Sequence, residues 1–186
     1  MSSKKRKQKL PEEQQVCMKT FYPKNRSQQL LIEAIEENEI TIAVGVAGSV
    51  KTFVSIATAL SLLGDVYKKI ILIKSVTPIP GESIGYIPGS YEEKMEPYLM
   101  SFTWNIDKLL GKGASKDLMH KEILEVLPLT YVRGLSIDNS IVILDEAQNF
   151  DTHTFKTIVT RIGENSKYIF LGDIEQVDRK NKQESC

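Results

Sequence analysis

The chain has 186 residues, of which 41% are hydrophobic and 26% charged, and its formal net charge is zero. This composition is ordinary for a soluble globular domain, and it excludes a wholly disordered, collagen-like or disulfide-stapled chain. The two cysteines, Cys17 and Cys186, are too few and too far apart for a disulfide framework or a zinc site. With no apolar run long enough to cross a bilayer and no secretory signal, we expect a cytoplasmic protein.

Basic side chains gather at the N-terminus. Residues 1–10 hold five of the 24 basic residues and no acidic one, which leaves 19 basic against 24 acidic residues over 11–186. Such a tail suits contact with nucleic acid or a nuclear address, but a solvated, disordered terminus gives the same pattern. We therefore expect a flexible basic tail over residues 1–20, and the neutral chain gives no general indication of nucleic-acid binding.

Apolar spacing predicts helices and strands that alternate along the chain. Continuous apolar runs of four or five residues indicate strands buried on both faces, and apolar residues three and four apart indicate helices. In chain order these patterns predict a helix over 26–38 capped by Ser27, a strand over 40–44, a helix over 51–63, a strand over 70–73, a loop over 74–89, helices over 91–110 and 115–125, a strand over 141–144, a helix over 152–162 and a strand over 168–171. This alternation indicates an α/β fold with a mostly parallel sheet flanked by helices.

A candidate phosphate-binding loop lies between the first predicted strand and the helix that follows it. Its residues are Gly45, Val46, Ala47, Gly48, Ser49, Val50, Lys51 and Thr52. In such a loop the backbone N–H groups surround a phosphate at the helix N-terminus. Lys51 would add positive charge at the β- and γ-phosphates, and Thr52 would place its hydroxyl on Mg²⁺. The alternative is a glycine-rich turn with a solvated Lys51.

Val50 departs from the pattern G-x-x-x-x-G-K-[ST], which has glycine at this position. Glycine lets the backbone pass close to the phosphates and take unusual dihedral angles. The branched side chain of Val50 is expected to crowd the loop or the phosphate. We therefore predict that nucleotide binding survives and that turnover is weakened.

Two acidic residues directly follow the predicted strand over 141–144. Asp145 would hold Mg²⁺, and Glu146 would act as the general base that polarises the attacking water. Two acids after a strand also serve as an ordinary helix cap and first-turn charge. Their position after a phosphate loop favours the second half of an NTPase site.

The segment Gly172-Asp173-Ile174-Glu175-Gln176 closes the last predicted strand. The carboxyl ends of parallel strands share one edge of a sheet, so Asp173 and Gln176 are expected to face the same crevice as the other loops. Gln176 would orient the attacking water or sense the γ-phosphate, although a β-turn with a solvated glutamine gives the same pattern.

Taken together, these segments resemble the PhoH-like P-loop ATPases, relatives of the superfamily 1 helicases. The resemblance covers roughly residues 22–178, and it is most specific in the segment Pro80–Gly89 and in the string Asp145-Glu146-Ala147-Gln148-Asn149. It implies a RecA-like core that binds and hydrolyses ATP with Mg²⁺. It also implies helicase-like action on single-stranded RNA and a homo-oligomeric ring, in a bacterial or phage-infected cell.

The resemblance assigns three further site residues. It places Gln28 against the adenine base, for which a side-chain amide offers both a donor and an acceptor. It matches Arg133, assigned to nucleotide binding, and Arg161, assigned to catalysis, to arginines that meet phosphate charge at their own site or across a ring neighbour. From the residues alone, Gln28 is an exposed helix residue and the two arginines are surface charges or ion pairs.

The expected organisation is a tail over 1–20, one ATPase domain over 21–178 and a polar tail over 179–186. Because the family continues beyond the segment that ends at Gln176, the resemblance implies a copy truncated at its C-terminal end. A catalytically impaired nucleotide-binding or structural oligomer subunit is therefore the alternative to an active ATPase. Trp104 is expected to pack as an anchor, and His120 and His153 to lie on the surface.

Overall fold

A computed structural model describes residues 21–46, 48, 50–74, 91–129, 137–173 and 175. For residues 91–98 and Pro128 it describes the backbone alone. The tails expected over 1–20 and 179–186, and all but the first residue of the loop expected over 74–89, lie outside these residues. Those expectations stay predictions.

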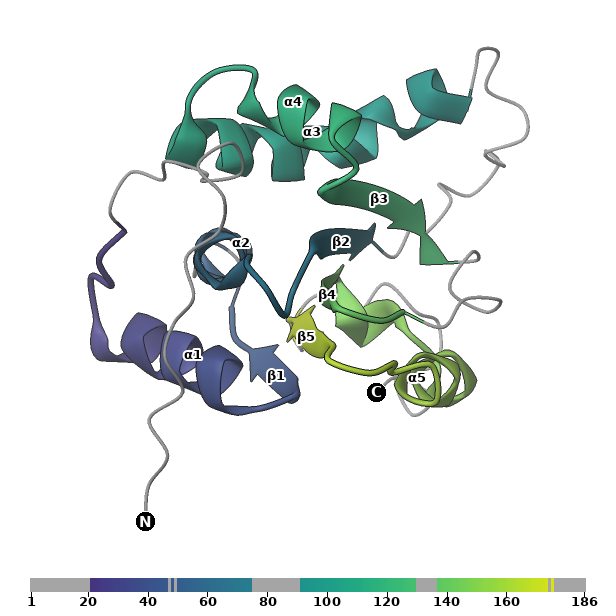
Figure 1. Cartoon of the computed structure of the whole chain (residues 1–186). Coiled ribbons are helices and arrows are strands. Elements are labelled where there is room, and N and C mark those ends of the chain that lie inside the picture. Colours follow the sequence, from purple (N-terminus) through teal and green to yellow (C-terminus); the bar gives the residue numbers. More distant parts are fainter. Residues whose placement is uncertain are drawn as a thin grey trace.

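Five parallel strands form one sheet between two layers of helices, which confirms the predicted fold class (Figure 1). The strands are β1 (Ile40–Val44), β2 (Lys69–Lys74), β3 (Leu124–Pro128), β4 (Ser140–Asp145) and β5 (Lys167–Gly172), in the spatial order β1-β5-β4-β2-β3. Helices α1 (Arg26–Glu37), α2 (Lys51–Leu62), α3 (Tyr91–Leu110) and α4 (Ala114–His120) cover one face, and the turn η4 (Ala147–Asn149) and helix α5 (Thr152–Val159) lie over the other.

The alternation of side chains along the strands divides the core into two clusters. In β2, Ile70 and Leu72 pack beneath the layer of α1–α4, whereas Ile71 and Ile73 face α5. Each of the four is exposed by 5% or less. Burial of one such side chain contributes about 1.5–3 kcal/mol to stability. Because both faces are covered, the inner strands read as continuous apolar runs.

Three predicted helix limits were wrong, and one of them is the end of the helix predicted over 152–162, which lies at Val159. Asn25, and not Ser27, caps α1, because its side chain accepts a hydrogen bond from the Gln28 N–H at 2.9 Å. The helix predicted over 115–125 ends at His120, and Leu124–Pro128 form strand β3 beside β2. β3 is an edge strand with a charged Glu125 inside it, so it lacks the continuous apolar run by which the other strands were found.

Trp104 does not pack as predicted. Its side chain is 64% exposed, and the Lys108 ammonium lies 4.8 Å from the centroid of its ring. Phe102 and Ile106 are buried and anchor α3 on the sheet. Helical periodicity therefore places Trp104 on the outer face of α3.

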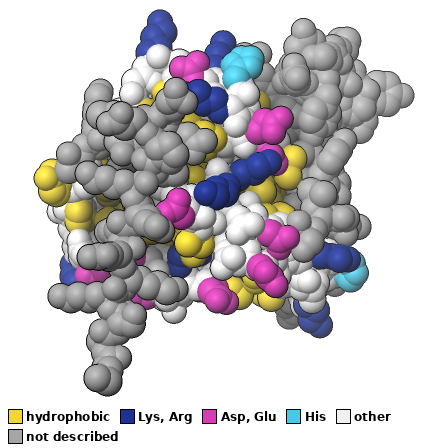
Figure 2. All heavy atoms as spheres, viewed as in Figure 1, with side chains coloured by type: hydrophobic (Ala, Val, Ile, Leu, Met, Phe, Trp, Pro, Cys, Tyr) yellow, Lys and Arg dark blue, Asp and Glu magenta, His cyan; other side chains and the backbone are white. Residues whose placement is uncertain are grey.

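The surface seen in Figure 2 mixes acidic and basic side chains with small hydrophobic areas. His120 and His153 are exposed, as predicted.

Within the described ranges, no helix combines the length and the apolar content needed to span a membrane.

Candidate functional site

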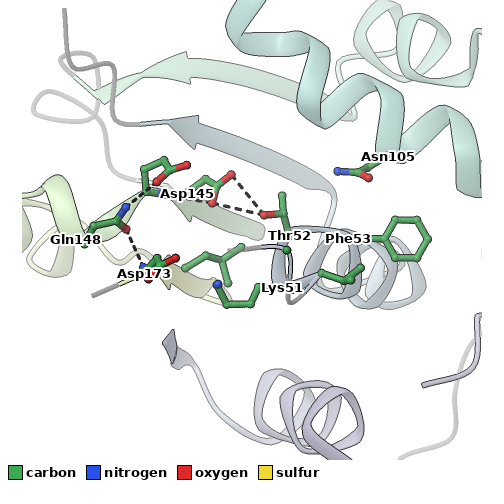
Figure 3. A pocket seen from close by; sticks show the side chains of 12 residues that line it. Lys51, Thr52, Phe53, Asn105, Asp145, Gln148 and Asp173 are labelled. Carbon is green, nitrogen blue, oxygen red and sulfur yellow. Dashed lines mark hydrogen bonds between the residues drawn. The ribbon is translucent and has the colours of Figure 1, made fainter. Parts of the chain in front are cut away.

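A cavity of about 340 Å³ lies where the carboxyl ends of β4 and β5 meet the N-terminus of α2 (Figure 3). The described residues that line it are Gly48, Val50, Lys51, Thr52, Phe53, Asn105, Asp145, Glu146, Gln148, Leu171, Gly172 and Asp173. Parallel strands bring their carboxyl ends to one edge of the sheet, which is where open α/β sheets bind ligands.

In the loop between β1 and α2, two of the described residues lie in the left-handed region. Gly48 has φ 76°, and Val50 has φ 63° and ψ 19°. Glycine takes such angles freely, whereas an L-residue with a Cβ loses about 1–2 kcal/mol there. The backbone at position 50 therefore has the conformation that favours the glycine of the sequence pattern. Ala47 and Ser49, the other predicted members of this loop, lie outside the described residues.

Lys51 begins α2 and points back along the loop. Its Nζ donates hydrogen bonds to the carbonyl oxygens of Gly45, at 2.6 Å, and Val46, at 3.1 Å. These contacts hold the ammonium beside the cavity, which Lys51 also lines. The positive charge is thus placed to meet an anion bound at the N-terminus of α2.

Thr52 and Asp145 bring two oxygen ligands together at the cavity. Thr52 Oγ1 lies 3.4 Å from Asp145 Oδ2 and 3.5 Å from Oδ1 (Figure 3). A hydroxyl and a carboxylate fit Mg²⁺, which takes few protein ligands and completes its shell with phosphate oxygens and water. The donor set therefore suits a magnesium ion that binds with a nucleotide.

Burial raises the pKa of the Asp145 carboxyl, and the neighbouring charge of Glu146 raises it further. Lys74, the Glu146 N–H and the Thr52 hydroxyl act in the opposite direction. A partly buried carboxylate in this environment gains from a cation bound beside it, because the cation offsets the lost hydration.

Glu146 lines the cavity directly after Asp145. Its backbone is left-handed, with φ 58° and ψ 38°, and it precedes the turn η4. Left-handed conformations in residues other than glycine are costly and cluster at functional sites. Gln148 Nε2 donates a hydrogen bond of 2.6 Å to Glu146 Oε2. The Glu146 carboxylate is therefore fixed by the local backbone and by a neighbouring amide.

Two predicted site residues lie away from the cavity lining. Gln28 is 9% exposed, and its Oε1 accepts a hydrogen bond from the Lys24 N–H at 2.7 Å, so its side chain closes the start of α1. Arg161 is an exposed residue after α5, and its carbonyl accepts a hydrogen bond from the Tyr168 hydroxyl. Arg161 thus lies near the amino ends of the strands, opposite the cavity. Arg133 and Gln176 lie outside the described residues.

Six cavity residues had no assigned role in the sequence analysis: Phe53, Asn105, Gln148, Leu171, Gly172 and Asp173. Gln148 belongs to the Asp-Glu-Ala-Gln string and Asp173 ends the last strand, so both carried a positional signal. Asp173 is 6% exposed; its Oδ1 accepts from the Glu175 N–H, and its Oδ2 is buried with no hydrogen-bond partner among the described residues. Phe53 and Asn105 stand inside helices, where sequence spacing gave no sign of a site.

Comparison with known protein sequences points to one family. A family model described as PhoH-like protein matches residues 20–186. A PhoH-like protein of Bacillus subtilis is 35% identical over 160 residues, which cover 86% of this chain and 50% of that protein. Protein PhoH2 of the same bacterium is 37% identical over 84% of this chain and 37% of its own length. Protein PhoH of Escherichia coli is 35% identical over 83% of this chain and 44% of its own length.

The chain thus spans half or less of the length of these relatives. Among solved structures, the large terminase from a thermophilic bacteriophage matches 81% of this chain and 39% of its own. Its TM-score of 0.45 and identity of 12% make that similarity too distant to bear on function.

Proposed function

Because the chain belongs to the PhoH-like protein family, we propose that it binds ATP with Mg²⁺ at the described cavity and hydrolyses it. One observation supports this most directly. Thr52 and Asp145 are 93 residues apart in sequence, yet their side-chain oxygens lie 3.4–3.5 Å apart beside Glu146. A helix N-terminus with a lysine, a magnesium-type oxygen pair and a carboxylate base are the parts that phosphoryl transfer to water requires.

Each of these residues has a distinct part in the proposed reaction. The loop N–H groups and Lys51 bind the phosphates, and Thr52 and Asp145 hold Mg²⁺. Bound Mg²⁺ supplies positive charge against the phosphate oxygens. Glu146 accepts a proton from the water that attacks the γ-phosphate.

The second candidate is a nucleotide-binding subunit with impaired turnover. The left-handed backbone of Val50 favours it, because a branched side chain replaces the glycine of the phosphate-loop pattern at a residue whose backbone favours glycine. Loss of one preorganised contact to the transition state lowers turnover by about a hundredfold or more. Val50→Gly separates the two candidates: a rise in turnover with little change in binding would identify Val50 as the impairing residue.

We further propose single-stranded RNA and further copies of the chain as partners. Exposed Trp104, with the Lys108 ammonium against its ring, offers the aromatic and cationic surface on which bases stack. Arg161 is exposed and lies on the opposite side of the sheet's strand ends from its own cavity, so it suits a contact with the nucleotide of a neighbouring subunit. RNA-stimulated turnover that weakens with added salt would support the RNA partner, and a monomeric mass both with and without nucleotide would count against the oligomer.

The proposed function is tested by ATP binding with and without Mg²⁺, followed by turnover. We expect Mg²⁺-dependent binding of a fluorescent ATP analogue, and a loss of affinity of about tenfold or more in Lys51→Ala, because a charge-assisted contact is removed. Lys116→Ala, on the exposed side of α4, is the matched control and should bind as the unchanged chain does. Equal affinity of both variants would contradict a phosphate site at Lys51.

A further inference from the structure

Gln148 joins two segments of the cavity wall through one side chain. Its Nε2 donates to Glu146 Oε2 at 2.6 Å, and its Oε1 accepts from the Asp173 backbone N–H at 3.0 Å (Figure 3). Gln148 is only 3% exposed and comes from η4, whereas Asp173 directly follows β5. The amide therefore connects the end of β4 to the end of β5.

The contact with Glu146 restricts how that carboxylate can point. The left-handed backbone of Glu146 sets the direction of its side chain, and the Gln148 amide then holds one of its two oxygens. The other oxygen has no such contact with Gln148 and belongs to a residue that lines the cavity. A general base needs this arrangement, because its second oxygen must stay within hydrogen-bond reach of the water it deprotonates.

The contact with Asp173 determines how the Gln148 amide is oriented. The Asp173 N–H can only donate, so it must meet the carbonyl oxygen of the amide, and the NH₂ group then faces Glu146. An amide of the right length satisfies a donor on one side and an acceptor on the other. Glutamate at this position would keep the acceptor for Asp173 and lose the donor for Glu146.

We propose that Gln148 is a positioning residue, which orients Glu146 toward the attacking water and ties that orientation to the end of β5. This inference rests on the proposed function, because it assumes that Glu146 is the base. Gln148 lines the cavity, but its amide is bonded to Glu146 and to the Asp173 N–H, and we assign it no part in holding the nucleotide. Its effect should therefore appear in turnover and leave nucleotide affinity unchanged.

The first test compares Gln148→Glu and Gln148→Leu in the full chain, with kcat and ATP affinity measured separately. Misplacement of a catalytic group commonly costs up to about a hundredfold, so we expect kcat to fall at least about tenfold in both variants. Dissociation constants for the fluorescent analogue should stay within about twofold. Gln29→Glu is the matched control, because Gln29 Nε2 also donates to a glutamate, Glu33 Oε1, at 2.9 Å on α1. It should leave both quantities unchanged.

The second test uses a double-mutant cycle with Glu146→Gln. If Gln148 acts through Glu146, adding Gln148→Leu to Glu146→Gln should leave the residual turnover unchanged within about twofold. Independent, multiplying losses would overturn the inference, and so would full turnover in Gln148→Glu. Turnover that is absent from the unchanged chain despite ATP binding would instead contradict the proposed function, and the inference with it.

Discussion

Val50 combines a left-handed backbone with a branched side chain at the entrance to α2. The side chain is 46% exposed, so it gains little from packing in return for the strained backbone. The chain takes this left-handed conformation directly before Lys51 and Thr52, the first two residues of α2. Residue 50 therefore weakens the fold in the loop that is proposed to hold a phosphate.

We expect Val50→Gly to raise the free energy of unfolding by about 0.5–1 kcal/mol. Relief of the left-handed strain stabilises the folded chain by about 1–2 kcal/mol. The greater freedom of glycine in the unfolded chain offsets up to about 1 kcal/mol of this. Urea unfolding measures the difference. Val46→Gly is the control, because Val46 is 55% exposed in the same loop and has no positive φ. It should lose stability, and a gain in both variants would contradict the assigned strain.

Asp145 is expected to reduce stability at neutral pH. Burial raises its pKa, so the folded chain holds this proton more tightly than the unfolded chain, whose Asp pKa is about 4. Its contribution to stability therefore falls as pH rises from that value through the raised folded-state pKa.

Asp145→Asn should raise the melting temperature at pH 7, with a difference that shrinks as the pH is lowered from the raised folded-state pKa toward about 4 and is absent below about 4. The same variant should lose the Mg²⁺ dependence of nucleotide binding. A melting temperature at pH 7 that falls in Asp145→Asn would show that the ionised carboxylate stabilises the fold.

At the scale of elements, α1 shows how a cap is chosen among neighbouring polar residues. Asn25 has an extended backbone and its side chain accepts from the Gln28 N–H, whereas Ser27 lies inside the helix. Both residue types are good caps, so the sequence alone did not separate them.

Asn25→Ala should lower the free energy of unfolding by about 1 kcal/mol, because the Gln28 N–H loses its partner at the end of a helix. Ser27→Ala should change it by less than about 0.5 kcal/mol, since Ser27 is exposed on the first turn. Thermal unfolding of both variants tests the assignment, which fails if Ser27→Ala is the more damaging of the two.

The strands that could be predicted are those that are buried on both faces and therefore read as continuous apolar runs in the sequence. β1, β2, β4 and β5 are short runs of branched apolar residues, and each was placed within one residue of its ends. β3 could not be found, because an edge strand with Glu125 inside it and a preceding helix together read as one helix. Trp104 was misplaced because its aromatic character favoured burial, whereas the periodicity of α3 turns it outward.

The sequence predicts those parts of the candidate site that directly follow a strand. It does not predict contacts between side chains that are distant in sequence. A loop after β1 and acids after β4 follow from the sequence. The contacts of Gln148 with Glu146 and Asp173 depend on β5 lying beside β4, which no local pattern reveals. Gln28 likewise holds Lys24 through a contact that spacing does not show.

At the scale of the whole molecule, β1 forms an open edge of the described sheet. Glu39 accepts from the Tyr168 N–H and Gly45 donates to the Gly172 carbonyl, so the odd-numbered residues face β5. In a parallel ladder the backbone groups of Ile42 and its even-numbered neighbours then point outward. The Ile42 side chain is 61% exposed, beside an apolar groove of about 200 Å³ that includes Phe155 and Phe170.

An apolar strand edge without a charge tends to pair with other chains. We expect the 186-residue chain to associate as its concentration rises, and Ile42→Lys to reduce that association. Analytical ultracentrifugation over a range of concentrations measures both. Val66→Lys, at a residue 49% exposed outside the sheet, is the control. Association that is equally strong in both variants would exclude the β1 edge as its cause.

The position of β5 also has a consequence for biosynthesis. Among the described strands β1 pairs with β5 alone, and β5 separates it from β4, although β5 is the last of them to be translated. A nascent chain on the ribosome can form α1 and α2 early, but among the described strands β1 has no partner until residues 167–172 emerge. We therefore expect the proposed nucleotide site to form late in synthesis, in a single step, once β5 has paired with β1.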